Sequence, residues 1–153
     1  MTRAVTLAVG VAAALAFLTI SAATQDRFPD APGRTELLRV CSECHEAGSV
    51  LETPQTAEAW SETLATMARQ GAEATDEEWR LIEQYLDANL ALIRINAAAA
   101  DEIRRTMDVT KAIADAVTKY REQNGPFKSV DDLKKVPGLD AAKVDGRKER
   151  LIF

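Results

Sequence analysis

Apolar residues recur at helical spacing along this chain, and that spacing constrains the fold more than any other feature of the sequence. Trp60, Leu64 and Met67 stand at positions i, i+4 and i+7, on one face of a helix. The stripe of a second, longer helix is formed by five residues, Trp79, Ile82, Leu86, Leu90 and Ile93. No run shows the alternation and hairpin signals that are typical of strands. The sequence therefore predicts an all-α fold.

Short-range signals predict where these helices begin and end. A first short helix follows Gly33, and Pro54 suits the first position of the next one. Gly71 ends that helix. Thr75 and Glu78 have the spacing of a capping box, which predicts the start of the longer helix.

The first 23 residues have the pattern of a secretory signal. Arg3 supplies the positive charge, residues 4–20 form an uncharged apolar run, and small residues follow up to Ala23. We predict cleavage after Ala23, and the alternative is an uncleaved membrane anchor, since 17 apolar residues are at the lower limit for a span. Either way the rest of the chain is exported, and we expect a periplasmic location.

Charge divides the remaining chain into two parts. Residues 24–94 contain 14 acidic residues, six arginines and no lysine, for a net charge of −8. Residues 95–153 contain 12 basic and 10 acidic residues, for a net charge of +2. We therefore predict two domains, 24–94 and 95–153, packed against each other because the sequence around Arg94 is apolar and lacks a flexible linker.

Reactive residues are few, since the chain has one histidine and two cysteines. These three lie together in Cys41-Ser42-Glu43-Cys44-His45, the C-x-x-C-H pattern of covalent haem c attachment. A zinc site would need a further cysteine or histidine, and a thioredoxin-like pair belongs near a β-α-β pattern. The pattern predicts one covalent haem c, with thioethers to Cys41 and Cys44 and with His45 as the proximal iron ligand.

Methionine is the expected distal ligand, because no second histidine is available. Met67 follows His45 by 22 residues and lies on the same helix face as Trp60, whereas Met107 lies in the other half. The alternative is that Met67 only fills the core, with the iron five-coordinate or water-bound. We expect Met67 to bind the iron.

Residues 34–92 resemble a small class I cytochrome c of the type that accompanies quinoprotein and molybdenum dehydrogenases. The landmarks that follow the haem motif are Trp60, Met67, Gly71-Ala72 and Tyr85-Leu86. This resemblance implies that Met67 is the distal ligand, that the first and last helices of this half pack together, and that the protein carries single electrons and is not an enzyme.

Residues 95–153 resemble a tandem helix-hairpin-helix domain like that of the competence DNA receptor ComEA. Gly125 is placed to end a helix, Ser129 and Asp132 to cap the next, and Phe127 and Leu133 to fill the core. Further landmarks are Ile95-Asn96, Ala98, Glu102-Ile103, Ala112, Tyr120-Arg121-Glu122, Asn124, Pro126, Val130 and Val136-Pro137-Gly138-Leu139.

That family binds DNA through a Gly-apolar-Gly turn in each hairpin, whose amides receive phosphate. We align these turns with residues 106–108 and 138–140, so that Asp108 and Asp140 replace the second glycine. An aspartate there is expected to cap the following helix and to repel phosphate. The sequence thus predicts that nucleic acid is an unlikely partner and that this half docks to a protein.

The resulting hypothesis is an exported monohaem c-type cytochrome that passes electrons to a redox protein, such as a periplasmic dehydrogenase or a larger redox complex. The alternatives are a haem-bearing structural subunit of such a complex and a competence-type DNA-binding protein. A weak basic patch would favour the last. Its candidate residues are Lys134, Lys135, Lys143, Arg147, Lys148 and Arg150.

Overall fold

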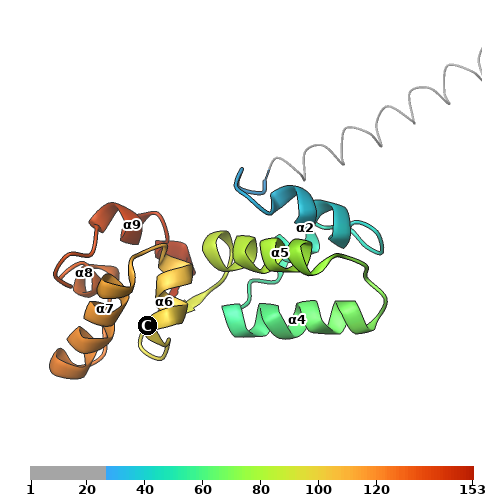
Figure 1. The fold of residues 1–153 in the computed structure, drawn as a ribbon. Helices are drawn as coiled ribbons and strands as arrows, with labels where there is room; N and C mark the ends of the chain where they lie inside the picture. The colour runs from blue at the N-terminus through green and yellow to red at the C-terminus, as the bar shows by residue number, and fades with distance from the viewer. Residues whose placement is uncertain (1–26) are drawn as a thin grey trace, which may run out of the picture.

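The computed structural model describes residues 27–153, and they are mostly helical (Figure 1). The predicted signal sequence and its cleavage after Ala23 lie outside the described residues. The first half holds α2 (Arg34–Cys41), α3 (Ser49–Glu52), α4 (Ala57–Arg69) and α5 (Asp76–Asn89). The second half holds β1 (Ile93–Arg94), α6 (Ala100–Met107), α7 (Lys111–Asn124), α8 (Val130–Leu133), α9 (Ala141–Asp145), a 3-10 turn (Lys148–Arg150) and β2 (Leu151–Ile152).

In the first half, α2 and α4 both pack against α5 (Figure 1). The capping box at Thr75 is confirmed: its hydroxyl accepts from the amide of Glu78, and the Glu78 carboxylate accepts from the amide of Thr75. The expected start at Pro54 is wrong. Thr56 caps α4 instead, because its hydroxyl accepts from the amide of Ala59.

The apolar stripe of α5 does not continue to Ile93. The helix ends at Asn89, and Ile93 lies fully buried in β1, where it pairs with Leu151 of β2 in a parallel register. Arg94 pairs with Ile152 in the same way. Both strands are two residues long, so the all-α class holds with this one small sheet as the exception.

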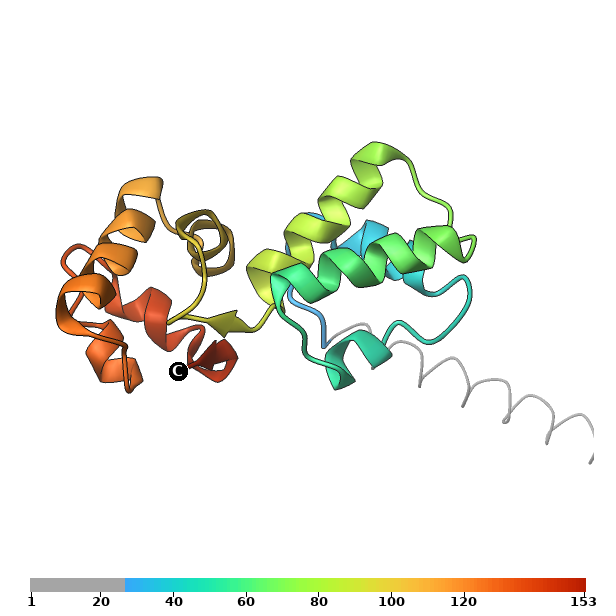
Figure 2. The same cartoon turned by 90° about the horizontal axis from the view of Figure 1, so that it is seen from below.

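The second half consists of two helical hairpins, α6–α7 and α8–α9, around a core of its own (Figure 2). Gly125 follows the last residue of α7, as expected, with φ of 85°. Ser129 caps α8 by accepting from the amide of Asp132, which confirms that expectation. Phe127 and Leu133 are buried in this core.

Two arginines join the halves. Arg105 of α6 donates to the carboxylate of Asp87 in α5 over 2.8 Å. The guanidinium of Arg150 donates to the carbonyl oxygens of Asp87 and Ala88 in the last turn of α5, to that of Ala91 just after the helix, and to that of Thr106 in α6. Desolvation lowers the pKa of Arg150 to about 10, so it still carries its charge at neutral pH. The halves are therefore held together by direct contacts.

Among the described helices, none has both the length and the apolar character that crossing a membrane requires.

Candidate functional site

The turn of the first hairpin is formed by residues 108–110. Asp108 ends α6 in the left-handed conformation, with φ of 50°. Val109 follows, and Thr110 caps α7 by accepting from the amide of Ile113. A threonine just before a helix is a cap signal that the sequence contains, although the predicted turn lies two residues earlier, at 106–108.

The second hairpin repeats this plan. Gly138 has a φ of 80°, Leu139 is buried, and Asp140 caps α9 by accepting from the amide of Ala142. In each turn, a residue in the left-handed region is thus followed by an apolar residue and then by the helix cap. Residues 138–140 are where the resemblance to the helix-hairpin-helix family predicts the second turn, and residues 108–110 are their counterpart in the first hairpin.

The expected register of the first turn is therefore wrong. Thr106 and Met107 are buried in the last turn of α6 and cannot form the loop. The turn is Asp108-Val109-Thr110, so the cap of α7 is an uncharged threonine. Only Asp140 caps a helix as predicted.

The carboxylate of Asp108, at the first hairpin turn, has two cationic side chains beside it. Its Oδ2 lies 2.7 Å from Nζ of Lys143 in α9 and 4.0 Å from a terminal nitrogen of Arg147. Lys143 also donates to the backbone oxygen of Asp108. The hydrogen bond from Lys143 holds the pKa of Asp108 below its usual value. Because two cations balance this carboxylate, the repulsion expected at the turn is largely cancelled.

A further cation stands at the start of α7. Lys111 is the first residue of this 14-residue helix, directly after the Thr110 cap, and its ammonium lies 2.8 Å from the carboxylate of Asp115. The positive end of the helix dipole and the Lys111 side chain therefore act at the same turn. Together, Lys111 and Lys143 place one cation beside each hairpin.

The basic patch suggested by the sequence is divided in the structure. Lys134 pairs with Asp145 at 2.5 Å, and Lys135 pairs with Asp132 at 2.8 Å. Arg150 points into the junction and not to the surface. Two members of the patch, Lys143 and Arg147, lie beside the first hairpin turn, where both are within 4.0 Å of the Asp108 carboxylate.

The residues of the C-x-x-C-H motif lie in the other half, at the end of α2. Cys41 is buried, and desolvation raises the pKa of its thiol to about 11, whereas Cys44 and His45 are exposed. Nδ1 of His45 lies 3.3 Å from the carbonyl oxygen of Glu46. Met67 is half-buried on α4. None of these four residues lines any of the five pockets described for the protein.

One known protein family matches a defined part of this chain. Residues 88–151 match the family of the helix-hairpin-helix motif. ComE operon protein 1 of Bacillus subtilis is 39% identical over 49 residues, which are 32% of this chain and 24% of that protein. The human endonuclease/exonuclease/phosphatase family domain-containing protein 1 is 39% identical over 57 residues, 37% of this chain and 10% of that protein. No solved structure matches the chain.

An uncharacterized protein of Haemophilus influenzae is 32% identical over 62 residues, 40% of this chain and 55% of that protein. The matches thus span from about a tenth to about half of the length of these relatives. The family match begins at residue 88, near the end of α5. The domain boundary after Arg94 stays a prediction.

These findings contradict the cytochrome interpretation, and we withdraw it. The matched family is that of the helix-hairpin-helix motif, the Bacillus subtilis relative is a ComE protein, and neither is a cytochrome. Within residues 27–153, no group of three or more His, Cys, Asp or Glu side chains is placed to hold a metal ion. The haem c cofactor, the electron-transfer function and the redox protein partner are withdrawn with it.

The statement that nucleic acid is an unlikely partner is also contradicted, by the same family match and ComE relative. The physical reason is that the cap of the first turn is the uncharged Thr110 and that Asp108 is paired with Lys143. The individual ligand roles of Cys41, Cys44, His45 and Met67 are not tested by these findings and stay predictions from the five-residue pattern and its spacing to Met67.

Proposed function

We propose that residues 88–151 bind duplex DNA and that the protein is a non-catalytic DNA-binding protein of the competence type. The observation that carries this proposal is the pair of hairpin turns with one plan, each flanked by a lysine: Lys111 at the first and Lys143 at the second. The match to the helix-hairpin-helix family and the ComE relative support it.

These turns are expected to bind the phosphate groups of DNA. The amides at the start of α7 and the ammonium of Lys111 present positive charge to an anion at the first hairpin. Lys143 and Arg147 do so at the second, once they exchange Asp108 for phosphate. Such contacts position a protein on the backbone without reading base sequence. We therefore expect binding that depends weakly on sequence and strongly on salt.

We propose no catalytic activity on the DNA. The match to the human endonuclease/exonuclease/phosphatase family domain-containing protein 1 covers only 10% of that protein.

We further propose that the protein acts after export, in the periplasm. The signal pattern of residues 1–23 supports export. The acidic first half, with a net charge of −8, would keep DNA away from that half and leave contact to the hairpins.

A salt-dependent titration tests the proposal. The full chain is titrated into a fluorescein-labelled 20-base-pair duplex, and anisotropy is followed at several salt concentrations. We expect saturable binding whose affinity falls as salt rises. Lys111→Ala should weaken binding and reduce the salt slope by about one, because one phosphate contact is lost.

The matched control is Lys119→Ala, an exposed lysine further along α7 and away from the turn. It should bind as the unchanged protein does. The absence of saturable binding at low salt, or equal losses in the two variants, would contradict the proposal.

A further inference from the structure

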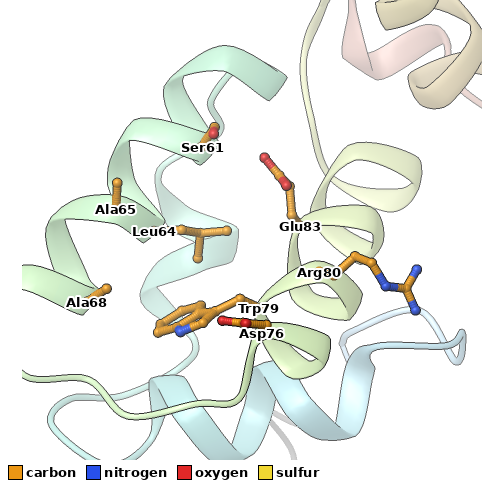
Figure 3. A pocket seen from close by; sticks show the side chains of 8 residues that line it. All are labelled: Ser61, Leu64, Ala65, Ala68, Asp76, Trp79, Arg80 and Glu83. Atoms are coloured by element: carbon orange, nitrogen blue, oxygen red, sulfur yellow. The ribbon is translucent and has the colours of Figure 1, made fainter.

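A groove runs along the seam between α4 and α5 in the first half, and the residues that line it do not include those of the hairpin turns. Its apolar part is lined by Leu64, Ala65 and Ala68 of α4 and by Trp79 of α5, around a cavity of about 390 Å³. Figure 3 shows Leu64 and Trp79 reaching into it, whereas Arg80 points away. Arg80 is also paired with Glu77, so it adds little positive charge to the rim.

The groove continues into a second cavity of about 470 Å³, which shares Ser61 and Glu83 with the first. This part lies where α4 and α5 meet α6. Six carboxylates line it against a single guanidinium, that of Arg105. These acidic residues are Glu58, Glu62, Glu83, Asp87, Asp101 and Glu102.

The acidic part has negative charge that the protein does not balance. Arg105 is engaged by Oδ2 of Asp87, and Oδ1 of the same buried carboxylate has no hydrogen-bond partner. Burial raises the pKa of Glu102; Arg105 and Arg94 act against this shift, whereas the nearby carboxylates of Asp87 and Glu58 add to it. A positively charged ligand could donate a hydrogen bond to Oδ1 of Asp87 and would reduce the repulsion among the neighbouring carboxylates.

Length and chemistry point to a helix as the occupant. From Glu58 to Ala68 the groove follows α4 for roughly 15 Å, about three helical turns at 1.5 Å per residue. Ala65 and Ala68 have no side chain beyond Cβ, so large apolar residues of a second helix can enter between α4 and Trp79. Basic residues about one or two turns further along would then reach the acidic part.

We propose that this groove binds an amphipathic helix of a partner protein, with apolar residues at its Trp79 end and lysine or arginine at its Glu58 end. The charge excludes nucleic acid as the occupant, because phosphate would be repelled by the same carboxylates. This site is independent of the DNA-binding proposal, since it shares no residue with the hairpin turns.

A synthetic peptide tests the site in the full chain. The probe is a fluorescein-labelled 14-residue helical peptide with leucines on one face of its first half and lysines in its second half. The comparison peptide has glutamate in place of every lysine. We expect saturable, salt-sensitive binding of the first and at least tenfold weaker binding of the second.

Two variants separate the groove from general attraction to an acidic surface. Ala68→Gln places a longer side chain in the apolar part, and it should weaken binding of the lysine peptide at least fivefold. Ala112→Gln, at an exposed alanine of α7, is its matched control and should change nothing. Glu58→Gln with Glu62→Gln should lower both the affinity and its salt dependence, with Glu122→Gln as the exposed control.

Equal binding by Ala68→Gln would overturn the proposal, because the peptide would then be held by charge alone. Displacement of the peptide by duplex DNA would overturn it as well, since the two ligands would share a site. Failure of DNA binding in the same protein would contradict only the proposed function. The groove would still be tested independently by peptide binding.

Discussion

Oδ2 of Asp108 in the first hairpin lies 2.7 Å from Nζ of Lys143 in the second. The two turns are therefore joined by an ion pair that a phosphate group would have to open. The same carboxylate lies 4.0 Å from Arg147, so one aspartate holds two of the cations nearest to the turns.

Removal of this carboxylate should strengthen DNA binding. In Asp108→Asn, Lys143 and Arg147 no longer share an internal anion and can meet phosphate directly. An exposed ion pair is worth about 0.2 to 1 kcal/mol, so we expect roughly 1.4-fold to fivefold tighter binding and a steeper salt slope. The measurement is the anisotropy titration with the labelled duplex.

Asp131→Asn is the matched control, since Asp131 is an exposed aspartate of α8 whose nearest cation, Lys134, is 3.9 Å away. A similar gain in the control would show that net charge alone is responsible. Weaker binding by Asp108→Asn would mean that Asp108 orients Lys143 for the phosphate and does not compete with it.

Arg150→Met should loosen the junction between the halves. Four carbonyl oxygens, of Asp87, Ala88, Ala91 and Thr106, would lose a charged donor in a partly buried place. We expect a loss of about 2 to 4 kcal/mol in the free energy of unfolding, measured by urea denaturation. Lys148→Met, at an exposed lysine two residues earlier, should change it by less than about 0.5 kcal/mol.

Glu102→Gln should stabilise the protein in a pH-dependent way. Burial raises the pKa of Glu102 above its ordinary value of 4.5, so the folded state binds the proton more tightly than the unfolded state. The ionised carboxylate of Glu102 therefore destabilises the folded state at pH values above this raised pKa. This destabilisation disappears as the pH falls below 4.5 and the carboxyl is protonated in both states. Urea denaturation should show the variant to be more stable than the unchanged protein at pH 7 but not near pH 4.

Glu122→Gln, at an exposed position, should show no such difference between the two pH values. A gain from Glu102→Gln that persists near pH 4 would assign the effect to packing of the amide and not to the charge.

Two glycines with similar backbones should respond differently to alanine. Gly33 and Gly71 have φ of 94° and 102°, so each alanine introduces a strain of about 1 to 2 kcal/mol. A Cβ at Gly33 would also collide with the carbonyl oxygen of Leu81 and approach Cβ of Tyr85 to 2.9 Å, whereas Gly71 has open space.

Gly33→Ala should therefore cost at least about 3 kcal/mol, because α2 must move away from α5. Gly71→Ala should cost only the strain. Thermal and urea denaturation of the two variants give the comparison, and equal losses would show that α2 can shift without penalty.

Much of the helical framework was predictable, because its signals are local. The capping box at Thr75, the end of α7 before Gly125 and the cap at Ser129 depend on residues a few positions apart. The pairing of Ile93 with Leu151 was not predictable, since the partners lie far apart in sequence and each strand is only two residues long.

The functional site was predicted less well. Sequence spacing alone did not show that Asp108 adopts the left-handed conformation, and this error shifted the first turn by two residues. The ion pair between Asp108 and Lys143 depends on the packing of two hairpins, which no local pattern encodes. The C-x-x-C-H pattern led to a cofactor and a function that the family match contradicts.

The parallel pairing of β1 with β2 brings the entrance and the exit of the second half side by side. A unit whose two ends meet can be inserted into a loop of a larger protein without separating the flanking segments. Such a unit can therefore be gained or lost through an insertion or deletion at one point of the host sequence. This geometry suits a segment whose similarity to longer relatives extends over as little as a tenth of their length.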